Sequence, residues 1–324
     1  MDAFDKRYNL GQACFEDGLS VVYKALDQQT SQPVLIKRFK NKTRQRPMEA
    51  LLRFHREVER VSRIQHPNIL KVLSRFEHEG LECVISEFFE GAPVSVAAQA
   101  LGVDEAVDII AQAALALDAA HQAGMMHGRI NLSALWVGSD AAKRTVKLAN
   151  FGESLLLSLA DISEKAEIID TFGYLSPEQS GILRRPIDYR SDIYSLGVVF
   201  YQLVTGRLPY LGEEVDTLIH QHIAQKPAAP EALDARIPAV IGRIILRLIA
   251  KDPQERYQSL AGLIADLQEY QKQRARGAAE IDFEIARGDR LRQLSYHCGL
   301  VGRDAELAAL KAAFDRARQG QGSV

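Results

Sequence analysis

The chain has 324 residues, 47% of them apolar and 25% charged, an ordinary composition for a globular protein with room for two lobes or domains. Its 40 basic and 42 acidic residues give a formal net charge of −2, and this near-neutral balance argues against a dedicated nucleic-acid binder. The N-terminus carries no secretory signal and the longest apolar run, around residues 196–203, is too short to span a bilayer, so we expect a cytoplasmic protein without membrane insertion.

The first part of the chain contains short segments with the composition of β-strands. Residues 21–23 and 34–36, for example, are rich in β-branched side chains and are separated by turn-forming residues. One helix is predicted over residues 51–64, where apolar side chains recur at helical spacing and a proline follows. We therefore predict a small β-rich lobe over residues 1–89.

The pattern becomes helical after Gly91. Residues 193–204 are apolar on nearly every side, which predicts a helix buried in the middle of a lobe. Residues 241–250 and 260–270 form further amphipathic patterns. A larger helical lobe over residues 90–272, placed after the β-rich lobe, makes the predicted fold class α+β.

The last part of the chain has a different composition. Residues 273–298 are charged and mixed, which indicates a linker or an extended helix. Residues 299–324 open an amphipathic pattern that is too short to bury a core of its own. Two interpretations remain open, a helix that docks back on the main domain or the beginning of a further domain, and we favour the second.

Two motifs in the expected order resemble those of protein kinases. Residues 34–37 (VLIK) are similar to the third-strand motif whose lysine holds the α- and β-phosphates of ATP, and residues 171–178 (TFGYLSPE) are similar to the end of an activation segment. The chain thus resembles a bacterial serine/threonine protein kinase over roughly residues 8–270. The resemblance implies a two-lobed kinase-like fold and an ion pair between Lys37 and Glu57 on the following helix. For Lys37 and for Glu57 the alternative is a charged side chain that is exposed to solvent and does not form this pair.

The resemblance also implies three residues that hold the helical lobe together. Glu178 is expected to pair with Arg256, and Asp192 is expected to cap the buried helix and brace the catalytic loop. An N-cap aspartate contributes on the order of 1 kcal/mol, and a buried ion pair is costly to break from one side. These residues predict that the helical lobe folds normally.

The reactive positions depart from the family pattern. Residues 127–134 read HGRINLSA where the family has His-Arg-Asp and a later asparagine. Arg129 stands in place of the catalytic aspartate, Asn131 in place of a lysine and Ala134 in place of the metal-binding asparagine. Asn150, in Asn-Phe-Gly, replaces the aspartate that binds metal.

Each departure has a chemical consequence. An arginine stays protonated at physiological pH and cannot serve as a base, and loss of a general base costs about 10²–10⁴-fold in rate. Ala134 offers no ligand, and Asn150 offers one neutral oxygen where Mg²⁺ prefers carboxylates and phosphates. The three cysteines are far apart and fit no metal-ligand spacing. We therefore predict no metal site and no intact catalytic residue.

The substitutions also change the charge of the site and of the loop above it. Arg129 could face a phosphate directly or pair with Glu153 or Asp170, and we favour the pairing. In residues 15–22, which match the glycine-rich loop, only Gly18 is glycine. Because glycines let backbone N–H groups approach phosphate, the loop predicts weak nucleotide affinity or none.

These observations predict a catalytically inactive kinase-like module with a regulatory or scaffolding role in bacterial signalling. Residues 300–307 resemble the first helix of AAA-like signalling ATPases, so the expected partner is a protein or a downstream ATPase domain of the same chain. One alternative is an active but atypical ATP-dependent serine/threonine kinase that uses Lys37, Glu57 and a displaced acid. The other is a nucleotide sensor without catalysis, in which Lys37, Glu57 and Asn150 bind ATP weakly or without metal.

Overall fold

The computed structural model describes residues 3–40, 46–94, 101–139, 144–156, 165–212, 214–278 and 280–289. The chain forms two units, Met1–Arg292 and Gln293–Val324. The predicted further domain over 299–324 and its resemblance at 300–307 lie outside the described residues. None of the helices in the described ranges has the length and apolar character needed to cross a membrane.

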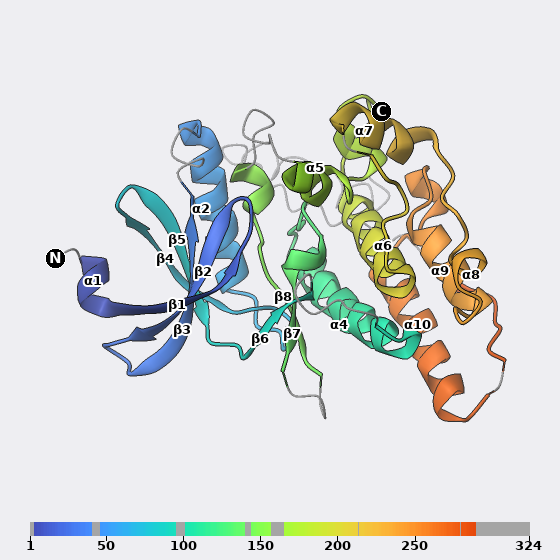
Figure 1. Ribbon diagram of the computed structural model, residues 1–324, viewed down its shortest axis with the longest axis horizontal. Coiled ribbons are helices and arrows are strands. Elements are labelled where there is room, and N and C mark those ends of the chain that lie inside the picture. Colours follow the sequence, from blue (N-terminus) through green and yellow to red (C-terminus); the bar gives the residue numbers. More distant parts are fainter. Residues whose placement is uncertain are drawn as a thin grey trace, which may run out of the picture. The chain divides into compact units, whose positions relative to one another are not determined.

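The first lobe is β-rich with one long helix, as predicted, and its strands form a five-stranded antiparallel sheet in the order β1-β2-β3-β5-β4 (Figure 1). Its elements are α1 (Ala3–Arg7), β1 (Tyr8–Glu16), β2 (Ser20–Asp27), β3 (Gln32–Phe39), α2 (Met48–Ser62), β4 (Val72–His78) and β5 (Leu81–Glu87). Helix α2 buries Phe54, Val58 and Val61, which lie on one face at helical spacing. The ring of Phe54 meets Phe39 of β3 edge-on at 5.4 Å between ring centroids, which fixes α2 against the sheet.

The second lobe is mainly helical and also contains a small three-stranded antiparallel sheet. Its strands are β6 (Gly91–Pro93), β7 (Leu135–Gly138) and β8 (Val146–Leu148). Its helices are α4 (Val103–Gln122), α5 (Lys165–Phe172), α6 (Tyr189–Thr205), α7 (Val215–Ala224), α8 (Pro230–Leu233), α9 (Ala239–Leu248) and α10 (Leu260–Ala275). Short 3₁₀ turns occur at Leu132–Ala134, Glu153–Leu156, Pro177–Ser180 and Pro253–Glu255.

Helix α6 is the centre of this lobe, which confirms the buried helix predicted from its apolar sequence. It packs between α4 and α9, and nearly every residue from Ser191 to Val204 is buried. A Cβ atom on Gly197 would lie 2.4 Å from the Cβ of Leu248 in α9. Glycine is therefore required there, because only a bare backbone allows the two helices to approach so closely.

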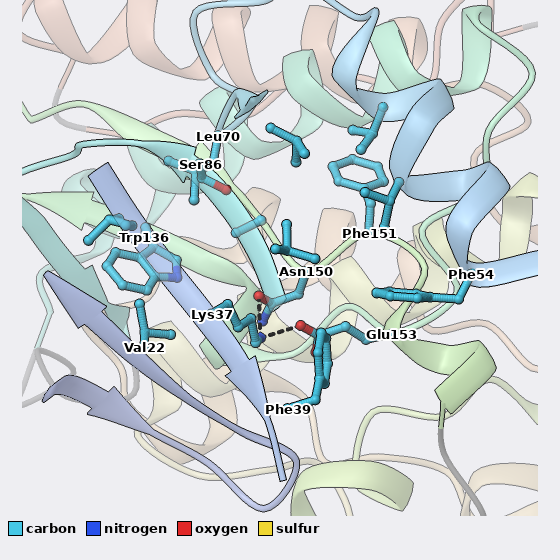
Figure 2. A pocket seen from close by; sticks show the side chains of 16 residues that line it. Val22, Lys37, Phe39, Phe54, Leu70, Ser86, Trp136, Asn150, Phe151 and Glu153 are labelled. Atoms are coloured by element: carbon cyan, nitrogen blue, oxygen red, sulfur yellow. Dashed lines mark hydrogen bonds and ion pairs between the residues drawn. The ribbon is translucent and has the colours of Figure 1, made fainter. Parts of the chain in front are cut away.

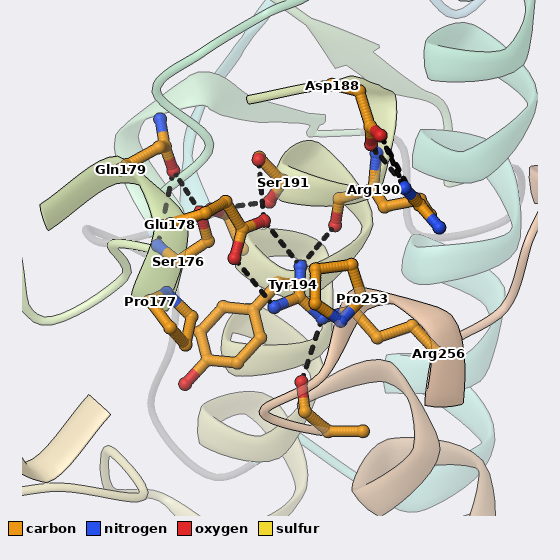
Figure 3. Close-up of polar contacts among 12 residues, drawn as sticks. Ser176, Pro177, Glu178, Gln179, Asp188, Arg190, Ser191, Tyr194, Pro253 and Arg256 are labelled. Carbon is orange, nitrogen blue, oxygen red and sulfur yellow. Dashed lines mark hydrogen bonds and ion pairs between the residues drawn. The ribbon is translucent and has the colours of Figure 1, made fainter. Parts of the chain in front are cut away.

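A buried ion pair joins the end of the activation segment to the segment between α9 and α10 (Figure 3). Arg256, with 0% of its side chain exposed, donates from Nη1 and Nη2 to the two carboxylate oxygens of Glu178 at 2.7 and 2.8 Å. Ser191 Oγ adds a hydrogen bond of 2.7 Å to the same carboxylate. The Glu178–Arg256 pair predicted from the sequence is present, and its polar atoms are satisfied, as a buried pair requires.

The segment that follows α10 also packs on the helical lobe. Ile281 is buried in the main core, and Asp289 accepts hydrogen bonds from Gln258 N at 2.6 Å and Ser259 Oγ at 2.8 Å. Part of the interval that the sequence suggested as a linker, 273–298, is therefore a docked extension of the lobe.

A buried histidine beside α6 predicts how the lobe responds to acid. His222 Nδ1 forms a hydrogen bond with Tyr194 Oη at 2.9 Å. Burial and the nearby charge of Lys251 lower the pKa of His222 to about 3. The unfolded chain takes up a proton at His222 below its ordinary pKa of 6.5, whereas the folded chain does so only near pH 3, so stability falls as pH falls through this window. We expect His222→Gln to make this decline shallower by up to about 1.4 kcal/mol per pH unit. Urea unfolding of both proteins from about pH 7 to about pH 4 measures it, and equal slopes would contradict it.

Candidate active site

Asp192 holds the loop 127–134 in place, as the sequence predicted. The predicted cap is wrong, because Asp192 lies in the first turn of α6 and the N-cap is Asp188, whose side chain accepts a hydrogen bond from Arg190 N at 2.9 Å. Its buried carboxylate accepts hydrogen bonds from the backbone N–H groups of His127 at 2.8 Å and Gly128 at 2.7 Å, and lies 2.9 Å from His121 Nε2. Burial raises the pKa of Asp192, but these hydrogen bonds outweigh it, so that the pKa lies below its ordinary value. The side chain of His127 bonds to Ala149 O at 2.7 Å, which ties the loop to the segment that carries Asn150.

Arg129 pairs with two carboxylates, which confirms the pairing favoured from the sequence over an arginine that faces phosphate. Its Nη1 lies 3.2 Å from Glu153 Oε2 and its Nη2 donates to Asp170 Oδ2 at 2.6 Å. Asn131 donates from Nδ2 to the other oxygen of Asp170 at 2.9 Å. The two residues that replace the catalytic aspartate and lysine thus bind one acid of α5, which belongs to the activation segment implied by the resemblance (residues 153–178).

Lys37 does not pair with Glu57, so this sequence prediction is wrong. Lys37 Nζ donates to Asn150 Oδ1 at 2.8 Å and forms an ion pair with Glu153 (Figure 2), while Glu57 pairs with Arg60 on its own helix at 2.9 Å. The physical reason is the burial of Glu153, which is 1% exposed and lies between two cations that compensate its charge.

Three carboxylates and two cations make up the polar part of the site, a formal charge of −1 when all are ionised. The carboxylates belong to Asp17, Glu153 and Asp170, and the cations to Lys37 and Arg129. Burial raises the pKa of Glu153 and of Asp170, against the opposing effect of the two cations. For Asp17 the charges of Lys37 and Arg129 outweigh burial, and its pKa lies below the ordinary value. The site is therefore more acidic than its substitutions alone suggest.

The donors present do not fit a protein-held magnesium ion. The side-chain oxygen of Asn150 is taken by Lys37, and Ala134 has no donor atom. Within the described ranges, no group of three or more histidine, cysteine or acidic side chains is arranged to hold a metal. We derive no catalytic step from a metal bound by this chain.

An apolar slot lies beside Lys37 and extends from β2, β3 and β7 to Phe54 of α2 and Phe151 (Figure 2). Val22, Leu35 and Trp136 line it and are almost fully buried, and Phe15 meets Trp136 at 6.2 Å between ring centroids. The remaining cavity has a volume of about 50 Å³, room for a few waters but not for a purine base. Nucleotide entry into this slot therefore requires these side chains to move.

Trp136 and Asp17 were not identified from the sequence as residues of the site. Trp136 is the one tryptophan of the chain, which was a usable signal, but its place in the slot depends on the pairing of β7 with β6 and β8. Asp17 belongs to the loop 15–22, and its sequence indicates only that it would crowd and repel a phosphate there. Its Oδ1 instead accepts hydrogen bonds from the backbone of Leu19 at 2.9 Å and Ser20 at 2.7 Å, which closes that loop onto Lys37.

The comparison with protein families gives one match over most of the chain. The family described as "Protein kinase domain" matches residues 11–267. The solved kinase domain of Mycobacterium tuberculosis PknI is 23% identical, with a TM-score of 0.64 over 81% of this chain and 95% of that chain. The structure of Rad53 in complex with AMP-PNP is 22% identical, with a TM-score of 0.66 over 81% of this chain and 65% of that one. At these identities the two structures establish the fold alone.

Curated relatives are more similar in sequence. A probable serine/threonine-protein kinase of Clostridium perfringens is 30% identical over 82% of this chain and 38% of its own length. Serine/threonine-protein kinase PknB of Mycobacterium leprae is 31% identical over 81% of this chain and 42% of its own length. The chain therefore spans about two fifths of the length of these relatives. Their names contradict the predicted catalytic inactivity and favour its alternative, an active kinase.

Proposed function

Because the chain belongs to the protein kinase family, as a bacterial serine/threonine kinase domain, we propose that it transfers the γ-phosphoryl group of ATP to serine or threonine hydroxyls. The observation that carries the proposal is the similarity, over four fifths of the chain, to proteins named serine/threonine-protein kinases. The predicted inactive module is set aside on this ground. The prediction of a protein partner or a downstream ATPase domain stays a prediction.

Lys37 supports the phosphate-binding part of this proposal. It is largely shielded from solvent and pairs with Glu153, whose other carboxylate oxygen is held by Arg129. Phosphoryl transfer depends mainly on positioning and on neutralising the charge of the phosphates, and fixed cations in a water-poor site do both. A bound triphosphate would compete with Glu153 and Asn150 for Lys37. Trp136 would move aside for the base.

Three acids near these cations support the displaced-acid form of the kinase alternative. An arginine at the usual base position cannot accept a proton. Asp17, Glu153 and Asp170 each lie within ion-pair distance of Lys37 or Arg129, so carboxylates are present although not where the family has them.

Phosphate transfer from labelled ATP tests the proposal. The purified chain is incubated with ATP labelled at the γ-phosphate and a generic serine- and threonine-rich protein, in parallel samples with Mg²⁺, Mn²⁺ or EDTA. We expect label on the substrate with the unmodified chain and a loss of at least about 10²-fold with Lys37→Met, because a fixed positive charge on the phosphates is removed.

The matched control is Lys272→Met, since Lys272 is an exposed lysine of α10 that lies 3.6 Å from Glu269. Absence of label in every sample, from a chain shown to be folded by circular dichroism, would refute the proposed activity. Equal labelling by Lys37→Met would show that a different site carries it.

A further inference from the structure

We propose that Asp170, supplied by the activation segment, is the group that accepts the proton of the substrate hydroxyl. The inference rests on the proposed kinase function and names the residue that takes over from the missing aspartate. It follows from three observations: which carboxylates near Arg129 are accessible, how Asp170 is held, and how the charges around it are arranged.

Two of the three carboxylates cannot be reached by a substrate hydroxyl. Glu153 is 1% exposed, and its oxygens face Lys37 and Arg129. Asp17 has only 8% of its side chain exposed; Oδ1 takes hydrogen bonds from the backbone of Leu19 and from Ser20, and Oδ2 faces Lys37. Asp170 differs, because 35% of its side chain is exposed while it contacts the catalytic loop directly.

The contacts of Asp170 position it without using up its oxygens. Oδ2 accepts from Arg129 Nη2 at 2.6 Å, and Oδ1 accepts from Asn131 Nδ2 at 2.9 Å. A carboxylate oxygen can accept two hydrogen bonds, so each oxygen keeps a position for an incoming hydroxyl. Arg129 is itself fixed, because it is buried and held from its other side by Glu153. Arg129 and Asn131, which look like losses in the sequence, act here as positioning residues for a displaced acid.

The chemical step balances with this assignment. The hydroxyl oxygen forms a bond to the γ-phosphorus as the bond from that phosphorus to the β–γ bridging oxygen breaks, and ADP leaves with the bonding electron pair. The hydroxyl proton passes to a carboxylate oxygen of Asp170 and later to water. Burial raises the pKa of Asp170 against the charges of Arg129 and Lys37, with Asp17 acting in the same direction as burial, and a more basic carboxylate is a better proton acceptor.

Single-turnover transfer from ATP to a serine peptide tests the assignment. We expect Asp170→Asn to lower the rate by about 10²–10⁴-fold, because a general base is lost. The Kd of ATP should change little, because Asp170 is not assigned a contact with the phosphates. We expect Asp170→Glu to keep the melting temperature, since the ion pair with Arg129 can persist, but to lower the rate measurably, because the longer side chain displaces the carboxylate from the hydroxyl. Asp234→Asn, in an exposed pair with Arg236, is the matched control and should not change the rate.

The pH dependence of the transfer rate distinguishes a general-base role of Asp170 from a purely structural role. The unmodified chain should lose rate at low pH as Asp170 takes up a proton, and Asp170→Asn should lack that acid limb. A rate for Asp170→Asn within twofold of the unmodified chain would overturn the inference, and so would a higher rate, since the Asp170–Arg129 contact would then block the site. If Asp170→Asn unfolds, an unchanged rate and pH profile in the folded Asp170→Glu would overturn it instead. Activity in the unmodified chain with either result would leave the proposed function standing, whereas an inactive unmodified chain would refute both.

Discussion

Replacing Glu178 with alanine is expected to lower the free energy of unfolding by about 3–5 kcal/mol, the usual cost of leaving one partner of a buried ion pair uncompensated. Arg256 is fully buried and donates to both oxygens of Glu178, so the substitution leaves a guanidinium inside the lobe without its counter-charge. Burial raises the pKa of Glu178, but the bonds from Arg256 outweigh it and keep the pKa below its ordinary value. The carboxylate is therefore ionised at neutral pH.

Urea unfolding followed by circular dichroism at neutral pH measures this loss. The matched control is Glu59→Ala, which removes the carboxylate of an exposed pair with Arg63 on α2 and should leave the unfolding midpoint unchanged within error. Equal effects of Glu178→Ala and Glu59→Ala would contradict the role assigned to the buried pair.

Replacing Trp136 with leucine is expected to raise the affinity for ATP by up to about 100-fold. The indole packs with Val22 and Leu35 in the apolar slot beside Lys37 and leaves a cavity of only about 50 Å³, so a base that enters must displace it. Moving a large apolar side chain out of such a site costs about 1.5–3 kcal/mol, which the smaller leucine avoids in part. Removing the obstruction therefore strengthens binding, even though the variant is itself less stable.

Isothermal titration calorimetry with ATP compares the two proteins. Because Trp136 is the one tryptophan in the sequence, its fluorescence in the unmodified chain also reports its movement when ATP is added. Phe76→Leu is the control, since Phe76 packs with Phe4 and Tyr8 in a separate cluster. Unchanged affinity in Trp136→Leu, together with unchanged fluorescence of the unmodified chain, would contradict this account of the slot.

The parts of the fold that the sequence predicted are those in which a short motif determines its own contacts. The apolar character of residues 193–204 was sufficient to predict the buried part of α6. Asp192 and the Glu178–Arg256 pair were predicted because each residue lies in a motif whose place in the fold is fixed. Burial then leaves few partners for such charges, so the contacts follow from the fold.

The site was harder to predict, because several possible partners compete for each charge. Glu57 has the family spacing for pairing with Lys37, yet Glu153 lies closer in space and is the more deeply buried carboxylate. Spacing along the chain gives no measure of that difference. The partners of Arg129 were named correctly, but the exposure that distinguishes Asp170 from Glu153 is visible only in three dimensions.

Mass spectrometry of a serine- and threonine-containing peptide, incubated with ATP and the purified chain, tests the central claim most directly. A relative with demonstrated kinase activity, assayed on the same peptide in the same buffer, supplies the positive control. The account predicts that the peptide gains one phosphoryl group with the unmodified chain and stays unmodified with Lys37→Met. A peptide that remains unmodified by the folded chain, while the relative phosphorylates it, would contradict the claim that this site transfers phosphate.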